Sequence, residues 1–164
     1  MYVGKKYAPG GYLWVFPTGD RFANIGIGIS GKYSKIKSAK KFLDEFMDHN
    51  YPQASIHTTM CGGVPCAKPM KKPISNGLML VGDAAHQINP MTGGGIASGM
   101  KAGWIAGHVA ATAIQKGDYS ERILQAYPDR MWRDFGRNYE RFYNIKQAIE
   151  HLNDADLNDI ADKA

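Results

Sequence analysis

Hydrophobic and polar residues alternate along residues 22–30, and a period of two over this length is typical of a β-strand with one buried face. The preceding apolar and aromatic segment, residues 12–17, is a second strand candidate, and residues 18–21 between them have the composition of a turn. The two segments are therefore predicted to form an antiparallel hairpin. One face of the later strand carries Gly26 and Gly28, which indicate either close packing or the close approach of a ligand.

Apolar residues recur at helical spacing in three further segments. The first begins at Ser38, a favourable N-cap residue, and runs to about His49. The second begins after Gly95, carries a glycine at every fourth position and ends at Gly117, so we expect it to pack closely on a sheet or on another helix. The third, a helix or a kinked pair with a proline in its first third, covers residues 120–152.

Two shorter strands are predicted between the first two helices. Residues 55–60 form one candidate, and residues 78–82 form the other, directly after the turn Asn76-Gly77. A basic segment broken by prolines, residues 68–73, connects them and is called the basic connector below. The pattern predicts an α+β fold with an antiparallel sheet, one strand that leads into a glycine-rich helix, and C-terminal helices.

Composition bounds the class of protein. The chain has 164 residues, of which 44% are hydrophobic and 21% charged, as in a globular protein. Its net charge of +5 favours acidic partners or is simply a mildly basic surface. Two cysteines, Cys61 and Cys66, make neither a disulfide framework nor a zinc site. Residues 1–10 lack the apolar core of a signal peptide, and residues 93–114 lack an uninterrupted apolar span, so we expect a cytoplasmic protein, with peripheral membrane association left open.

The last predicted helix has two chemically different sides. Four arginines lie within about 80° of one another at 100° per residue, and aromatic residues occupy the opposite side. The arginines are Arg130, Arg133, Arg137 and Arg141. This arginine stripe, or the basic connector with Lys68, Lys71 and Lys72, could attract the anionic head of a lipid and a membrane surface. The alternative is a solvated face that is partly neutralised by Asp129, Asp134 and Glu140.

The segment from residue 81 to residue 96 carries the clearest chemical pattern. Asp83 follows Gly82 at the end of an apolar strand, where its carboxylate can accept hydrogen bonds from the hydroxyls of a polyol. Three glycines, residues 93–95, open the next helix, so backbone N–H groups can hold negative charge there. A flavin has both features. The simpler alternatives are that Asp83 caps a turn, that Pro90 is an ordinary loop proline and that the glycines serve only tight turns.

Two motifs resemble known families. Gly82-Asp83-Ala84-Ala85-His86, with Pro90 and Gly93-Gly94-Gly95 behind it, resembles the second flavin-binding motif of the para-hydroxybenzoate hydroxylase-like flavoproteins. Tyr12-Leu13-Trp14-Val15-Phe16-Pro17 resembles the Tyr-x-Trp-x-Phe-Pro signature of the geranylgeranyl reductase family. The resemblance covers nearly the whole chain and is greatest to the archaeal members.

The resemblance implies that reduced FAD delivers hydride to isoprenoid double bonds of membrane lipids, and no electron donor or proton donor is identified. It implies that Tyr12, Trp14 and Phe16 line the cavity for the prenyl chain, whereas the alternative interpretation makes them core aromatics. It also implies that Gly82, Asp83, Pro90, Gly93, Gly94 and Gly95 bind the flavin. Residues 1–75 would then belong to a substrate-binding domain, residues 76–117 to the FAD-binding domain and residues 118–164 to a helical region.

The chain departs from the family at one point. It lacks the Gly-x-Gly-x-x-Gly turn between a strand and a helix that binds the ADP half of FAD, and Gly26-x-Gly28-x-x-Gly31 lies within a strand pattern. We therefore expect the C-terminal portion of a longer protein, without the N-terminal FAD domain and with weak FAD binding on its own. The alternatives are a portion of an FAD-dependent monooxygenase of the same superfamily, or a non-catalytic module that binds lipid or nucleic acid. Nucleic acid is not an expected partner.

Overall fold

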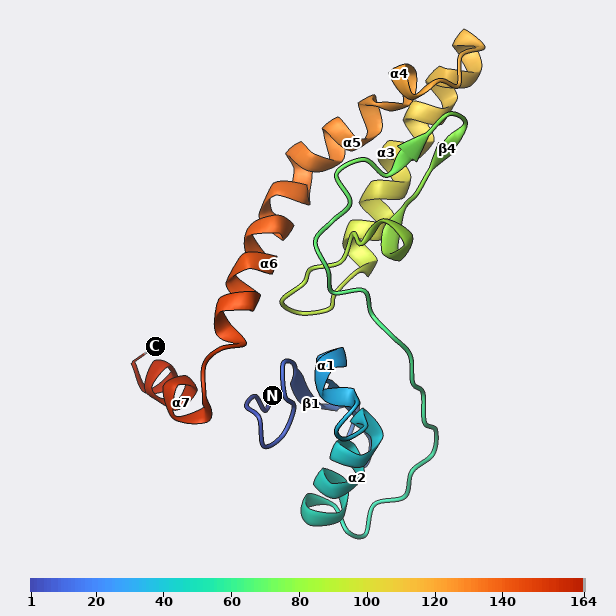
Figure 1. Cartoon of the computed structure of the whole chain (residues 1–164). Coiled ribbons are helices and arrows are strands. Elements are labelled where there is room, and N and C mark those ends of the chain that lie inside the picture. The colour runs from blue at the N-terminus through green and yellow to red at the C-terminus, as the bar shows by residue number, and fades with distance from the viewer. Residues whose placement is uncertain (164) are drawn as a thin grey trace. The chain divides into compact units, whose positions relative to one another are not determined.

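The computed structural model describes residues 1–163, and these residues divide into two compact units. The first unit combines residues 1–61 with the C-terminal segment from residue 150, and the second unit is residues 62–149. Figure 1 shows the chain from the N-terminus in blue to the C-terminus in red. Each unit has a hydrophobic core of its own. The three-part division at residues 75 and 117 remains a prediction about the longer protein, whereas the compact units of this chain have other limits.

The first unit is built on the predicted hairpin. Strand β1 (Tyr12–Pro17) pairs with β2 (Ala23–Gly28) in antiparallel register, with Trp14 opposite Gly26. The alternation of the sequence places Leu13 on the inner face, where it is fully buried against Phe46 of helix α2 (Ala39–Asn50). The hairpin prediction is therefore confirmed.

The helices of the first unit begin at polar caps. The Ser38 hydroxyl oxygen accepts a hydrogen bond from the Lys41 N–H at 3.2 Å, so α2 begins where the sequence predicts. A short helix α1 (Gly31–Ser34) precedes it, and α7 (Asp154–Asp162) follows an Asn153 capping box.

The predicted strand at residues 55–60 is wrong. This segment forms no ladder and lies in an extended stretch, residues 51–63, whose residues are all exposed. Its apolar side chains Ile56 and Met60 are 65% and 91% exposed, so no face of it is buried. A short apolar run stays irregular when no neighbouring strand offers hydrogen bonds and a packing surface.

The second unit begins with a short hairpin. Strand β3 (Ile74–Ser75) pairs with β4 (Leu78–Met79) across a turn in which Gly77 has a φ of +69°. The predicted strand over residues 78–82 is shorter in the structure, because its partner β3 offers only two residues for pairing; Gly82 then turns the chain with a φ of +65°. A 3₁₀ turn η1 (Gly82–Ala85) follows.

Helix α3 (Ile96–Lys116) has the limits that the sequence predicts, with Gly117 in the left-handed conformation at its end. Its buried face consists of alanine, isoleucine and valine, not glycine. Gly103 and Gly107 are exposed, and a Cβ atom at either position would meet nothing within 4 Å. Within residues 1–163 the expected close packing is therefore not met at Gly103 and Gly107, whereas Gly95 and Gly99 lie close to the segment from Gly82 to Ile88.

The C-terminal helices of this unit follow one another in series: α4 (Glu121–Leu124), α5 (Ala126–Met131), a π-helical turn η2 (Trp132–Gly136) and α6 (Arg137–Ile149). Pro128 lies in the first turn of α5, where an absent N–H costs little. The π-helical turn η2 ends at Gly136. A Cβ atom at this position would lie 2.6 Å from the Trp132 ring, so the glycine leaves room for the ring. The predicted kinked pair is thus a series of four helical segments.

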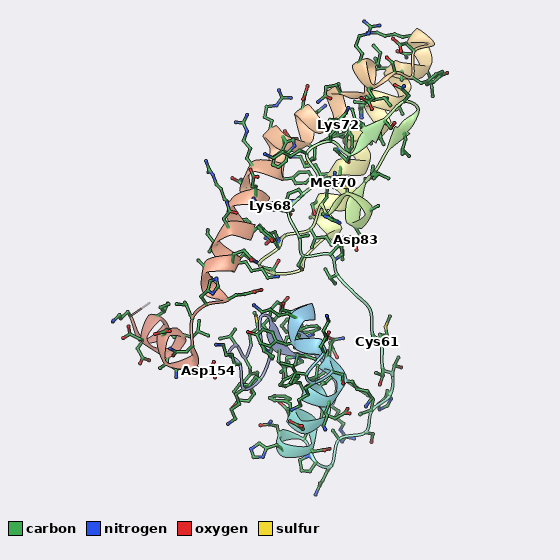
Figure 2. All side chains as sticks on the ribbon, in the orientation of Figure 1. Cys61, Lys68, Met70, Lys72, Asp83 and Asp154 are labelled. Carbon is green, nitrogen blue, oxygen red and sulfur yellow. The ribbon has the colours of Figure 1, made fainter. Side chains whose placement is uncertain are left out.

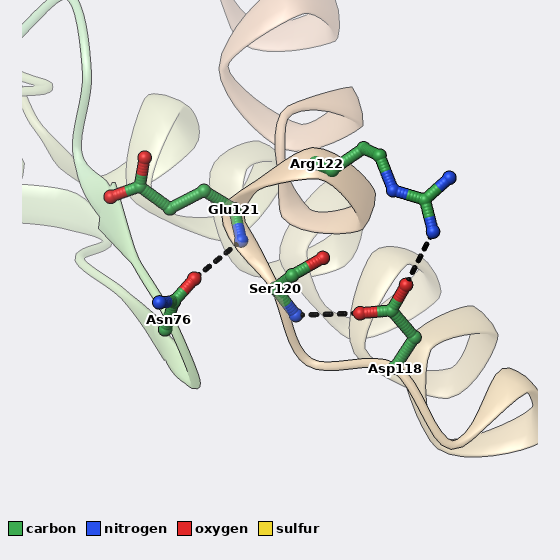
Figure 3. Close-up of polar contacts among 5 residues, drawn as sticks. All are labelled: Asn76, Asp118, Ser120, Glu121 and Arg122. Carbon is green, nitrogen blue, oxygen red and sulfur yellow. Dashed lines mark hydrogen bonds and ion pairs between the residues drawn. The ribbon is translucent and has the colours of Figure 1, made fainter.

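Two hydrogen-bonded side chains fix the start of α4 (Figure 3). Asp118 accepts a hydrogen bond from the Ser120 N–H at 2.9 Å and pairs with Arg122 at 2.7 Å. Asn76, from the β3–β4 turn, accepts from the Glu121 N–H at 2.9 Å. The hairpin and α4 are therefore held together at this point.

The core of the second unit lies between α3, α4, α5 and the β3–β4 hairpin. Ala102, Ile105 and Val109 of α3 pack with residues of the later helices. Those partners are Leu124, Tyr127, Met131 and Phe135. No helix among residues 1–163 combines the length and the apolar content that crossing a lipid bilayer requires.

Candidate functional site

The chain turns sharply where β4 ends. Val81 is extended, Gly82 has a φ of +65°, and η1 places the Asp83 carboxylate on the surface, as Figure 2 shows. His86 closes this turn in the left-handed conformation with a φ of +53°, an uncommon backbone conformation for a residue other than glycine. Its Nδ1 atom lies 3.2 Å from the carbonyl oxygen of Lys68, so the His86 ring contacts the basic connector.

A buried network holds the turn in place. Gln87 is fully buried, and its Oε1 atom accepts a hydrogen bond from the Gly82 N–H at 2.7 Å. Its Nε2 atom donates to the Tyr127 hydroxyl at 2.6 Å, and that hydroxyl donates to the Leu80 carbonyl at 2.8 Å. The Gln87 carbonyl accepts from the Ser98 hydroxyl at 2.6 Å. The Gln87 side chain therefore links the turn to α5, its backbone carbonyl links the turn to α3, and the Tyr127 hydroxyl extends the network to Leu80.

The loop that follows is also fixed by its own hydrogen bonds. The Asn89 N–H donates to the Gly94 carbonyl at 2.9 Å, and the Gly93 N–H donates to the Asn89 carbonyl at 2.8 Å. Gly93 has a φ of +73°, a conformation that favours glycine. Pro90 is fully buried, so its ring stiffens the loop from inside. Direct contact between Pro90 and a cofactor stays a prediction.

The loop brings Asp83 to the beginning of α3. Gly95 is the N-cap residue and has no side chain, so no side-chain cap accepts hydrogen bonds from the first N–H groups of the helix. A Cβ atom at Gly95 would lie 3.4 Å from the Asp83 Oδ1 atom and 3.2 Å from Ile88. The absence of a side chain at position 95 therefore leaves room beside the carboxylate.

An open depression of about 310 Å³ lies at this place. It is lined by Val64, Asp83, Ile88, Gly93, Gly95, Ile96, Gly99 and Met100. The depression combines one carboxylate, glycine backbone and apolar side chains at the positive end of a helix dipole. Such a surface can accept hydrogen bonds from hydroxyls, donate them to an anionic ring edge and cover an apolar ring.

The three predicted substrate residues lie in the first unit, on the outer face of β1. Tyr12, Trp14 and Phe16 alternate with the buried residues of the strand, and none belongs to the hydrophobic core. The ring centroids of Tyr12 and Trp14 are 5.7 Å apart, and those of Trp14 and Phe16 are 6.2 Å apart and nearly parallel. The interpretation as core aromatics is therefore wrong, and these residues form one continuous aromatic surface.

The glycine face of β2 supports this aromatic surface. A Cβ atom at Gly26 would lie 2.2 Å from the Trp14 ring, so the indole covers the bare backbone of the opposite strand. The Trp14 Nε1–H donates to the Asn24 side chain at 2.7 Å, which fixes the ring orientation. The sequence left two explanations for these glycines, close packing or the close approach of a ligand, and close packing explains Gly26.

The structure thus brings Asp83, Gly93 and Gly95 to one depression and places the aromatic surface in the other unit. Sequence reasoning missed Gln87, Tyr127 and Ser98, which lie far apart along the chain. No local pattern marks a buried polar network, because its members are joined only by the tertiary fold.

Comparison with known proteins gives a consistent result. Residues 1–64 match the family model described as the geranylgeranyl reductase catalytic domain. The chain is 48% identical over 161 residues to digeranylgeranylglycerophospholipid reductase 1 of Methanococcoides burtonii, covering 98% of this chain and 40% of that protein. It is 44% identical over 165 residues to digeranylgeranylglycerophospholipid reductase of Methanoculleus marisnigri, covering 99% of this chain and 41% of that protein.

A solved structure agrees with these matches. The crystal structure of a geranylgeranyl bacteriochlorophyll reductase-like protein from Thermoplasma acidophilum matches with a TM-score of 0.91 and 36% identity, over 98% of this chain and 41% of that one. The mixed helices and small antiparallel sheets are therefore those of a geranylgeranyl reductase-like fold. The chain belongs to the geranylgeranyl reductase family, and it spans about 40% of the length of the curated relatives that it matches.

Proposed function

We propose that this chain is the C-terminal portion of an FAD-dependent reductase that saturates isoprenoid double bonds of a membrane lipid. The names of the relatives support the reaction class and a digeranylgeranylglycerophospholipid substrate. The observation that carries the proposal is the Asp83 carboxylate beside the glycine-opened start of α3. The remainder of a para-hydroxybenzoate hydroxylase-like FAD fold would bind the ADP half of the cofactor.

The residues of the depression fit the flavin half of FAD. The absence of a side chain at position 95 leaves more space beside Asp83, and the carboxylate there can accept a hydrogen bond from a ribityl hydroxyl. The backbone around Gly93, Gly94 and Gly95 can approach the pyrimidine edge of the ring, where N–H groups stabilise negative charge. Gly82 shapes the turn that presents Asp83.

When bound, FAD supplies hydride for the reduction of a carbon–carbon double bond. The chain itself supplies the surface that orients the substrate. Tyr12, Trp14 and Phe16 offer a row of neighbouring aromatic rings that suits a prenyl chain, and packing against them excludes water and limits the prenyl chain to few conformations. The proton donor is not assigned to any residue.

The experiment uses the full-length protein, in which this chain is joined to the portion that its relatives possess. We expect stoichiometric FAD and, with dithionite supplied anaerobically to reduce the flavin, a gain of two hydrogen atoms per double bond of the digeranylgeranyl lipid by mass spectrometry. Asp83→Ala removes charge-assisted hydrogen bonds, so the FAD dissociation constant should rise about 10- to 100-fold. Asp20→Ala, at an exposed turn of the other unit, is the matched control and should leave it unchanged.

Two results would contradict the proposal. In a parallel assay in air, oxygen consumption with an oxygenated product would indicate the monooxygenase alternative of the same superfamily. Equal FAD affinity in the Asp83→Ala variant and the wild type would show that Asp83 caps only its own turn. A non-catalytic module is disfavoured, because that interpretation gives no role to the depression beside Asp83.

A further inference from the structure

The acidic residues of the C-terminal helices are engaged with partners other than the arginine stripe. Asp129 accepts a hydrogen bond from Gln125 at 2.9 Å, and Asp134 pairs with Lys101 of α3 at 3.2 Å. Glu140 lies 3.6 and 3.8 Å from two lysines of the basic connector. The expectation that these three acids neutralise the arginine stripe is therefore wrong.

The basic connector is satisfied by the same contacts. Its lysines at positions 68 and 71 share Glu140, and their ammonium groups also lie over the rings of Tyr143 and Trp132. Lys72 pairs with Glu121. Three lysines share two carboxylates, so the connector keeps about one unit of uncompensated positive charge, less than the three unpaired arginines described next.

Three arginines of the arginine stripe remain as candidates for binding an anionic partner. Arg133, Arg137 and Arg141 are exposed, and none has an ion pair within the part of the chain that the structure describes. They recur every four residues along η2 and α6, so they lie on one side of the helix. Figure 2 shows nitrogen-tipped side chains that project from these helices on the side away from α3. Arg130 differs, because its guanidinium lies over the Trp104 ring at 4.4 Å.

Apolar residues continue the same spacing. Ile145 and Ile149 follow Arg141 at four-residue steps and are 49% and 39% exposed. At 100° per residue each four-residue step turns the position by about 40°, so the isoleucines lie beside the arginines on a surface that winds around α6. At a bilayer interface, arginines reach phosphates and neighbouring isoleucines enter the acyl boundary. Arginine suits phosphate because its planar fork donates two parallel hydrogen bonds.

We propose that Arg133, Arg137 and Arg141, continued by Ile145 and Ile149, form the surface that docks the protein on an anionic phospholipid bilayer. This inference deepens the proposed function, since it names the surface through which a lipid-reducing enzyme reaches its membrane. Charge complementarity carries it: these are unpaired cations, and the relatives are named for a phospholipid substrate. The docking does not depend on FAD.

The test measures co-sedimentation of the 164-residue chain with vesicles of phosphatidylglycerol and phosphatidylcholine in equal parts. We expect binding that weakens as salt is added and that is absent on pure phosphatidylcholine. Each arginine near an anionic surface contributes about fivefold, so R133A/R137A/R141A should bind on the order of a hundredfold more weakly. Circular dichroism should show an unchanged fold, because the three side chains are exposed and unpaired.

The matched control removes three cations that already have acidic partners. K40A/R122A/K163A has the same net charge as the test variant, and its parent residues pair with Asp44, Asp118 and Asp159. It should retain most of the vesicle binding. Equal losses in both variants would overturn the proposal in favour of general net charge, and binding to DNA without binding to vesicles would also overturn it. Loss of flavin binding in the full-length protein would refute the proposed function and leave this result unaffected.

Discussion

Gln87 and Tyr127 show how individual buried residues support the candidate site. A buried amide and a buried hydroxyl are favourable only when each of their hydrogen-bonding groups has a partner. Here both polar atoms of the Gln87 side chain are satisfied, one of them by the backbone of Gly82. The turn that presents Asp83 is therefore fixed from within the core and not by surface contacts.

Tyr127→Phe should destabilise the second unit by about 1–3 kcal/mol, because it leaves the Gln87 amide and the Leu80 carbonyl buried without partners. Urea unfolding measures the loss. Tyr119→Phe, at a tyrosine that is 52% exposed, is the control and should change stability by less than about 0.5 kcal/mol. Equal stability of the Tyr127→Phe variant and the wild type would show that this hydrogen-bond network does not contribute to the free energy of unfolding.

Single residues also show what the sequence could and could not reveal. Asp83 and Gly95 were identified as flavin-site candidates because a carboxylate after a strand and a glycine before a helix have local chemical meaning. The contact between Gly26 and the Trp14 ring was not predictable, because it depends on cross-strand register. Register is a property of two paired strands, so the sequence of one strand alone does not determine it.

At the scale of elements, the ends of α2 and α3 and the first hairpin were predicted well, whereas the two later strands were predicted poorly. Helix α3 begins and ends at glycines, and α2 begins at a serine cap, so local chemistry sets these limits. The strands at residues 55–60 and 78–82 depend on partners elsewhere in the chain. The first finds none within residues 1–163, and the second pairs over only two residues.

The start of α4 should respond to acid. The neighbouring Ser120 hydroxyl, the hydrogen bond from the Ser120 N–H and then the Arg122 guanidinium lower the pKa of the Asp118 carboxyl. Because the folded-state pKa lies below the unfolded value, ionised Asp118 contributes stability above the usual aspartate range, and that contribution is lost as pH falls through the lowered pKa.

Asp118→Asn should therefore reduce stability near neutral pH and flatten the acid limb of the unfolding curve of the second unit. Urea midpoints measured across the acid range compare the variant with the wild type. Asp20→Asn, in a turn of the first unit, should leave that acid limb unchanged. An acid limb as steep in Asp118→Asn as in the wild type would contradict the assignment.

At the scale of the whole molecule, the two hydrophobic cores share no residue. The sequence pattern accounts for Leu13 and Phe46 of the first core, since each lies on the apolar face of its own element. It did not reveal that the segment after Ile149 belongs with the N-terminal unit. That grouping arises from contacts such as the hydrogen bond from the Lys5 N–H to Asp154 at 2.7 Å, across most of the chain.

Leu13→Ala should lower the stability of the first unit by about 2–5 kcal/mol, because it leaves a cavity in a small core where Leu13 is fully buried. Calorimetry should then show an earlier transition for this unit and an unshifted transition for the second. Ile105→Ala, in the core of the second unit, should give the reverse. A single transition that moves as a whole in both variants would show that the units unfold together.

The exposed stretch at residues 51–63 joins the two units and contains neither a helix nor a strand. Its residues are exposed and belong to neither hydrophobic core. Lengthening a flexible connection costs little, since each doubling of loop length costs only about 0.6 kcal/mol. Insertions and deletions are therefore better tolerated here than in any helix of the chain. Differences in length among members of this family should concentrate at this stretch, which makes it the natural place to insert a reporter domain without disturbing either core.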